Sequence, residues 1–220
     1  MTHRALAFAA VAVLGAATPA AAQRSHIGLL AGPTAGTISG SYVTDAGSRE
    51  LGFSGFATLD REFGGIWGLH MALGWTQKGV DQAEVADDPG ETWGYSTSYL
   101  EVPISVQAKF RFADGKLSLA PHAGIGIGMS LGCKIKPGTQ FEFDETCDET
   151  TTGGTLQTLD LSVPVGAAFS VEFAGGSRFT ILDLAYSFGL TNVFTAAADA
   201  GQTARNGVLS FRFGFAMPLY

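Results

Sequence analysis

Charged residues are scarce in this sequence. Lys, Arg, Asp and Glu make up 15% of the 220 residues, whereas they make up about 25% of an average soluble domain. The formal net charge is −7, and no basic run is available to neutralise the phosphates of a nucleic acid. Hydrophobic residues reach 46%, with 30 glycines and 16 phenylalanines. This composition predicts a β protein with an apolar outer surface.

Long apolar runs are missing beyond the N-terminus. No later segment offers the roughly 18 consecutive uncharged apolar residues of a transmembrane helix. The chain begins with Arg4, an apolar stretch at residues 5–17 and three alanines at 20–22. This layout predicts a secretory signal peptide over residues 1–22 and one mature domain over residues 23–220. A buried N-terminal helix is the alternative, and the stretch lacks the amphipathic face that such a helix would need.

Only two cysteines are present, Cys133 and Cys147. An exported chain enters an oxidising compartment, so we expect them to form a disulfide. Free thiols and metal ligation are the alternatives. The segment has no histidine or further cysteine at zinc spacing, which disfavours the second of these.

What the sequence has in abundance is alternation of apolar and polar residues with a period of two. In the C-terminal segment Leu209, Phe211 and Phe213 share one face, while Ser210 and Arg212 share the other. Such alternation is typical of a strand with two different faces. Six segments show it clearly and two more show it weakly, which predicts eight strands in all: 26–37, 50–62, 67–76, 100–112, 117–131, 159–173, 182–190 and 209–217.

The connections between these strands alternate in length. Glycine-containing tight turns are expected at 63–65, 113–115 and 174–176, with the residue chemistry of hairpins. Longer polar stretches separate the other pairs, at 38–49, 78–96, 133–155 and 191–205. Transmembrane barrels have short periplasmic turns and long extracellular loops. The pattern therefore predicts that both termini lie on the short-turn side.

Periodicity alone does not say which face of the strands points outward. A soluble barrel has an apolar interior, and a membrane barrel has an apolar exterior. Here the faces opposite the apolar ones are rich in glycine, alanine and serine, which suits a narrow interior better than a soluble surface. We therefore expect an all-β protein, an eight-stranded antiparallel up-and-down transmembrane β-barrel. Aromatic residues near the strand ends are expected in its interfacial girdles, namely Trp67, Trp75, Phe110, Phe112, Phe173 and Phe179.

Two stretches carry a family resemblance. The run from Tyr99 through Pro103 to Phe112, and the strand 121–126 that follows, resemble the outer-membrane β-barrel domain family labelled PorT-like, close to the small OmpA- and OmpX-type barrels. The resemblance implies the outer membrane of a Gram-negative-type bacterium, contact with its lipid and insertion by the barrel assembly machinery. It implies no single activity, because this family is defined by fold and location. Tyr220 resembles the terminal aromatic residue of such proteins but is out of register with Phe211.

The predicted interior face carries many polar side chains, namely Asp60, Glu62, His70, Glu101, Lys109, Arg111, His122, Asp160, Glu172, Asp183 and Arg212. We expect a lumen charge network made of Glu101, Lys109, Arg111, Asp160, Asp183 and Arg212. Its carboxylates would pair with its cations, because an unpaired charge is costly in a dry, narrow lumen.

Signs of catalysis or cofactor binding are weak. His70 and His122 lie within predicted strands without a Gly-x-Ser-x-Gly motif, so we expect no catalytic residue and no enzyme. The glycines at 124, 126 and 128 lack the rest of a nucleotide fingerprint and suit barrel closure better. The acidic residues between 141 and 149 do not match an EF-hand loop, so a solvated loop is expected there, with calcium binding as the alternative. We expect no metal and no cofactor.

The function expected from the sequence is a structural or interaction role, with side chains filling the lumen and surface loops exposed to an extracellular partner. Trp93 and Tyr95, in the stretch read as a loop, are candidates for such a contact or for the interfacial girdle. A narrow, porin-like channel is one alternative. A lipid-modifying outer-membrane enzyme is another.

Overall fold

The computed structural model describes residues 24–45, 48–85, 92–136, 145–147, 156–173 and 178–219. Eight long strands dominate these residues: β1 (Ser25–Ser39), β3 (Glu50–Gly64), β4 (Trp67–Val85), β5 (Thr92–Ala108), β7 (Leu117–Lys136), β9 (Leu159–Phe173), β10 (Arg178–Gly189) and β11 (Arg205–Leu219). Short elements accompany them: β2 (Val43–Asp45), β6 (Phe110–Phe112), η1 (Ala113–Gly115), β8 (Glu145–Thr146) and α2 (Thr195–Asp199). The expected signal peptide at 1–22, the turn at 174–176 and Tyr220 lie outside the described residues.

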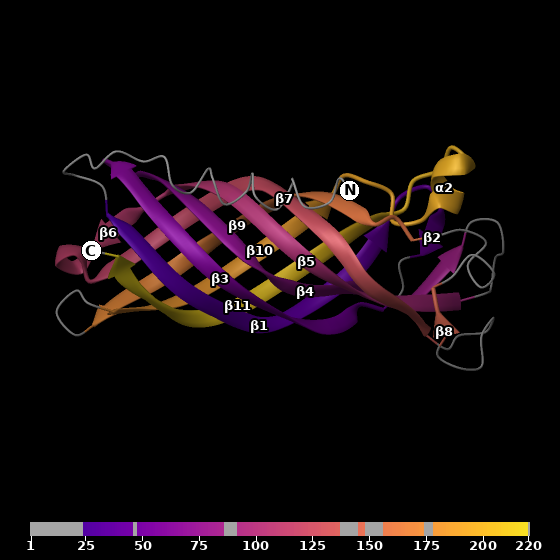
Figure 1. Ribbon diagram of the computed structural model, residues 1–220, viewed down its shortest axis with the longest axis horizontal. Helices are drawn as coiled ribbons and strands as arrows, with labels where there is room; N and C mark the ends of the chain where they lie inside the picture. Colours follow the sequence, from indigo (N-terminus) through magenta and orange to yellow (C-terminus); the bar gives the residue numbers. More distant parts are fainter. Residues whose placement is uncertain are drawn as a thin grey trace, which may run out of the picture.

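Each long strand pairs antiparallel with its neighbours in the chain, and the first strand pairs with the last. The order β4-β3-β1-β11-β10-β9-β7-β5 returns to β4 through the β4–β5 pairing. At the closing pair, Ala31 of β1 lies opposite Phe213 of β11. The eight-stranded antiparallel up-and-down barrel expected from the sequence is therefore confirmed (Figure 1).

The two faces of the barrel wall differ sharply in chemistry. On β11, Phe211, Phe213 and Phe215 point outward and are about half exposed, whereas Ser210 and Arg212 point inward and are buried. The same alternation runs through β1, β7 and β10. The exterior is apolar and the interior polar, which is the arrangement of a membrane barrel and the inverse of a soluble one.

Small residues on the inner face let the wall close tightly. A Cβ atom on Gly124 would lie 2.5 Å from the Cα of Ser105 on the neighbouring strand, closer than real Cβ atoms approach. This crowding favours the barrel-closing role of the glycine series at 124–128 over a nucleotide-binding one.

The two ends of the barrel differ. One end carries η1 and the C-terminal end of β11, and the other carries α2, β2 and β8 (Figure 1). At the first end the hairpin after β6 places Ala113, Asp114 and Gly115 at φ of 51°, 55° and 87°, the left-handed conformation that tight hairpins require. We call the first end the short-turn end and the other the long-loop end. Within the described part of the chain, no helix is long and apolar enough to cross a membrane.

The stretch at 78–96 is not the loop expected from the sequence. β4 continues to Val85 and β5 already begins at Thr92. The reason is apolar burial at the long-loop end, where Trp93 and Tyr95 are 7% and 0% exposed. Both residues are therefore core residues of this end, and neither is a girdle residue or an exposed contact.

Most of the expected girdle aromatics lie on the outer face. Trp67, Phe110, Phe112 and Phe173 are exposed, and Trp75 is half-buried. Phe179 is an exception, because it shares the inward parity of Asp183 and packs its ring edge-on against His26, 4.9 Å between centroids. Its assignment to the girdle was wrong.

The inside-out surface predicts how substitutions on the outer face will behave. Leu184 is 53% exposed near the middle of β10, whereas Leu190 is 50% exposed just beyond its end. Leu184→Arg should lower the free energy of unfolding in lipid vesicles by about 2–4 kcal/mol, because the charge would lie at mid-depth in hydrocarbon. Leu190→Arg should cost about 0–1 kcal/mol, because it lies near the interface.

The measurement is urea-induced unfolding, followed by the band shift between unboiled and boiled samples on a gel. Equal losses for the two arginine variants would mean that this outer face does not lie in hydrocarbon.

Candidate functional site in the barrel lumen

Three groups of mostly buried charged side chains are spaced along the barrel axis in the described part of the lumen, and a more exposed fourth group, Lys136 with Glu50 and Asp81, lies beyond them at the long-loop end. Of the three buried groups, the one on the long-loop side is centred on Lys78 of β4. Its Nζ atom donates to Oε1 of Glu101 and to Oδ2 of Asp160, each at 2.9 Å. All three side chains are almost completely buried. The ammonium also lies over the ring of Tyr99, 5.0 Å from its centroid.

Further hydrogen bonds complete the Lys78 group. Asp160 accepts from the Thr191 hydroxyl at 3.1 Å and from Nδ2 of Asn206 at 3.3 Å. Two carboxylates and one ammonium therefore share a network of neutral donors. Such satisfaction is what allows charges to persist in a low-dielectric interior.

Lys78 was missed from the sequence because it fell in the stretch read as a loop. The signal was available in the alternation itself. The inner face of β4 carries His70, Ala72, Gly74 and Thr76. Lys78 lies two residues beyond Thr76 and therefore falls on the same face.

The central group holds two Asp–His pairs. Nδ1 of His70 lies 2.8 Å from Oδ1 of Asp60, and Nε2 of His122 lies 2.9 Å from Oδ1 of Asp183. The two imidazole rings are 5.7 Å apart between centroids. Arg212 binds the second carboxylate, with its Nε donating to Oδ2 of Asp183 at 2.9 Å.

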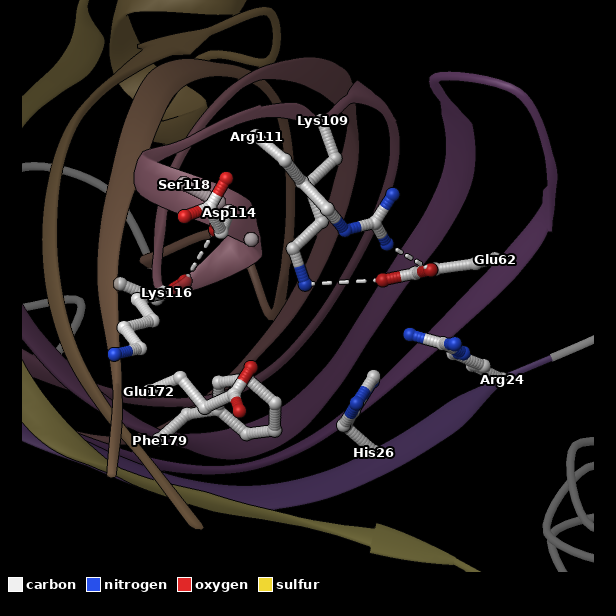
Figure 2. A pocket seen from close by; sticks show the side chains of 12 residues that line it. Arg24, His26, Glu62, Lys109, Arg111, Asp114, Lys116, Ser118, Glu172 and Phe179 are labelled. Atoms are coloured by element: carbon white, nitrogen blue, oxygen red, sulfur yellow. Dashed lines mark hydrogen bonds and ion pairs between the residues drawn. The ribbon is translucent and has the colours of Figure 1, made fainter. Parts of the chain in front are cut away.

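The third group lies at the short-turn end. Glu62 accepts from Nζ of Lys109 at 3.0 Å and from the guanidinium of Arg111. These three side chains border a cavity of about 130 Å³ that Figure 2 shows from close by, with Glu172 also on its wall.

The expected charge network is thus three groups with partly different partners. Asp183 does bind Arg212, but Glu101 and Asp160 bind Lys78. The expected pairing of those two carboxylates with Lys109 and Arg111 was wrong. The strands stagger around a tilted barrel, so side chains at similar distances along their strands need not meet across the lumen.

An apolar cluster closes the lumen at the long-loop end. Its buried members come from three strands, β1, β4 and β5, and from the segment around α2: Ile38, Val80, Ala83, Trp93, Tyr95, Val193, Phe194, Ala197 and Ala204. Below it, the Tyr95 hydroxyl donates to Oδ1 of Asn206 at 2.7 Å. The apolar cluster and the Lys78 group are therefore linked through Asn206, which hydrogen-bonds both Tyr95 and Asp160.

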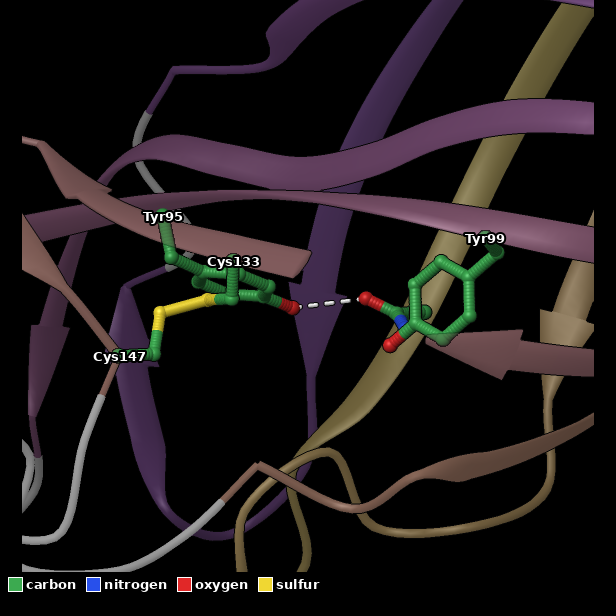
Figure 3. Close-up of a disulfide and its surroundings, with 5 residues drawn as sticks. Tyr95, Tyr99, Cys133 and Cys147 are labelled. Carbon is green, nitrogen blue, oxygen red and sulfur yellow. Dashed lines mark hydrogen bonds between the residues drawn. A yellow bond between two sulfur atoms is a disulfide. The ribbon is translucent and has the colours of Figure 1, made fainter. Parts of the chain in front are cut away.

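A disulfide fastens this end. Cys133 of β7 and Cys147 are joined, with their Cα atoms 5.4 Å apart, and Cys133 packs against the apolar cluster (Figure 3). The expected disulfide is confirmed. The acidic residues Glu142, Asp144, Asp148 and Glu149 lie outside the described residues. Elsewhere in the described segments, no group of three potential ligands could hold a metal ion.

The central histidines have little room for a substrate. An Asp–His pair orients an imidazole for proton transfer in many enzymes. The cavities beside His70 and His122 measure about 20 and 40 Å³, enough for one to three water molecules. The arrangement can order water inside the lumen, and it leaves no space for a lipid or peptide.

The Lys78 group makes a sharp stability prediction. Lys78→Met should lower the free energy of unfolding by about 3–5 kcal/mol, because it leaves two buried carboxylates without their cation. The triple variant Lys78→Met/Glu101→Gln/Asp160→Asn should lose clearly less, because no charge remains unpaired. Urea unfolding in vesicles measures both.

Lys134→Met is the matched control, since Lys134 is exposed and makes no ion pair within the described segments. Its stability should stay near that of the unsubstituted protein. If the single and triple variants lose the same free energy, charge compensation is not what holds the group together.

Comparison with known proteins gives one family and several distant structures. The family model described as "Outer membrane protein beta-barrel domain" matches residues 18–195. No curated protein matches the sequence. Similar solved structures include the attachment invasion locus protein Ail of Yersinia pestis, at 13% identity and TM-score 0.43, covering 88% of this chain and 99% of that one. OprG from Pseudomonas aeruginosa is 10% identical, with TM-score 0.47 and coverage of 90% and 97%.

The outer membrane protease OmpT from Escherichia coli is a further similar structure. It is 7% identical, with TM-score 0.44, and the match covers 93% of this chain and 99% of that one.

Proposed function

Because the chain belongs to the outer membrane protein β-barrel domain family, we propose that it serves a structural or interaction role in the outer membrane of a Gram-negative-type bacterium, without conducting solutes. In this proposal residues 1–22 are a cleaved export signal, residues 23–220 are the mature domain, and the barrel assembly machinery inserts it. The protein is not an enzyme in this proposal. Its apolar outer face lies in membrane lipid.

The observation that carries the proposal is the filled lumen. The Lys78 group crosses it from β4 to β9, and the apolar cluster caps it at the long-loop end. An eight-stranded barrel is just wide enough for side chains to fill it. Opening a water-filled path for solutes would require breaking the ion pairs of Lys78 and unpacking the apolar cluster, and both changes cost free energy.

The long-loop end supports an interaction role. In a barrel of this kind it is the extracellular end. Here β4 and β5 extend to Val85 and Thr92, and β7 extends to Lys136, with Cys133 near its end joined to Cys147. The apolar cluster beneath gives the surface connections a rigid base, which is how scaffolds present binding loops to a partner.

Conductance separates this proposal from the narrow-channel alternative. Purified, folded protein added to a planar lipid bilayer should give no discrete current steps, because the lumen is occupied throughout. A porin added to the same membrane is the positive control. Current steps from protein that still shows the heat-dependent gel shift would contradict the proposal and favour a transport function.

A further inference from the structure

The short-turn mouth of the lumen is locally cationic in an acidic protein. The cavity of about 130 Å³ found there is bordered by four Lys or Arg side chains and three carboxylates, although the chain as a whole carries a net charge of −7. We call this cavity the vestibule. Its cations are Arg24, Lys109, Arg111 and Lys116, and Figure 2 shows the side chains that surround it.

The ion pairs of the vestibule do not use up its positive charge. One carboxylate, Glu62, serves both Lys109 and Arg111. Arg24 and Lys116 form no ion pair with any residue in the described segments. Asp114 and Glu172 also line the vestibule and form no ion pair in the described segments, so its four cations exceed its three carboxylates by one. This excess positive charge lies in a partly enclosed, low-dielectric cavity, where fields are weakly screened.

A buried imidazole nitrogen in the same wall lacks a partner. His26 is 7% exposed and lines the vestibule, and its buried Nδ1 atom has no hydrogen-bond partner among the described residues. The ring is held in place by the edge of Phe179. Leaving such a group unsatisfied is costly, and groups of this kind in folded proteins usually mark a place for water or a ligand.

Hydroxyl donors complete the donor set. Ser118 and Ser170 lie at the vestibule wall with their hydroxyl oxygens hydrogen-bonded to each other. Guanidinium, ammonium, imidazole and hydroxyl groups are the donors that proteins use for phosphate and carboxylate groups. The volume admits a small ion or the charged end group of a larger molecule, and it is well below the roughly 300 Å³ of a drug-sized ligand site.

We propose that the vestibule is a binding site for a small oxyanion, a phosphate or carboxylate group, that enters from the periplasmic side. The side follows from the short turns, which face the periplasm in barrels of this kind. Arg24 and Lys116, which have no ion-pair partner in the described segments, supply charge-assisted hydrogen bonds, and the His26 ring lies in the same wall. The site is independent of whether the lumen conducts, because it lies outside the Lys78 group.

The test is a titration of the folded, detergent-solubilised protein with inorganic phosphate at constant ionic strength, with chloride as the balancing ion. The imidazole nitrogen signals of His26 in an NMR spectrum report binding at the site. Saturable movement of these signals is the expected result. A parallel titration with acetate distinguishes the ligand: a response to phosphate alone assigns the phosphate class, and a response to both assigns oxyanions in general.

Charge variants localise the site. Arg24→Gln and Lys116→Gln should each weaken phosphate binding by about tenfold, the loss of one charge-assisted hydrogen bond. Lys134→Gln removes the same charge at the opposite end of the barrel and should leave binding unchanged. The heat-dependent gel shift shows that each variant is folded.

Two results would overturn the inference. One is the absence of a saturable His26 response to either anion in the unsubstituted protein. The other is equal weakening of phosphate binding by Arg24→Gln and Lys134→Gln, which would mean that only the overall charge of the protein matters.

Discussion

The pairing of β1 with β11 is the constraint on which the rest of the structure depends. It joins the first strand to the last and leaves the sheet without an edge. A closed ladder satisfies the backbone hydrogen bonds internally, which lipid requires because it offers no alternative partner. Closure with eight strands also fixes a narrow lumen. The interior side chains must then fill that space and satisfy one another.

Polar side chains meet that requirement by filling the lumen and pairing with one another. Instead of an apolar core, the barrel is crossed by polar and charged groups that join strands distant in sequence, as Lys78 of β4 joins Asp160 of β9 and His122 of β7 joins Asp183 of β10. Each charged side chain in these groups has an oppositely charged partner, so these contacts hold the strands together from inside while the outer face stays apolar. The vestibule differs, because Arg24 has no ion-pair partner and Nδ1 of His26 has no hydrogen-bond partner in the described segments.

The sequence predicted the parts of this account that depend on local alternation. The strands, the tight hairpin at 113–115, the inversion of the faces and the Cys133–Cys147 disulfide all follow from period, turn chemistry and compartment. The partners across the lumen did not follow, because they depend on the stagger between strands. Lys78 and Tyr95 were wrongly assigned to a loop because β4 and β5 extend beyond the segments with clear alternation. The buried apolar cluster at the long-loop end stabilises these extensions.

The central claim is that the face carrying Leu182 and Phe213 lies in hydrocarbon while the lumen stays polar. Spin labels placed singly at these two positions, in protein inserted into vesicles, test it most directly. The account predicts that oxygen, which concentrates in lipid, relaxes both labels far more than a water-soluble nickel complex does, with the reverse at exposed Ser41 beyond the end of β1. Stronger relaxation by the nickel complex at Leu182 and Phe213 would contradict it.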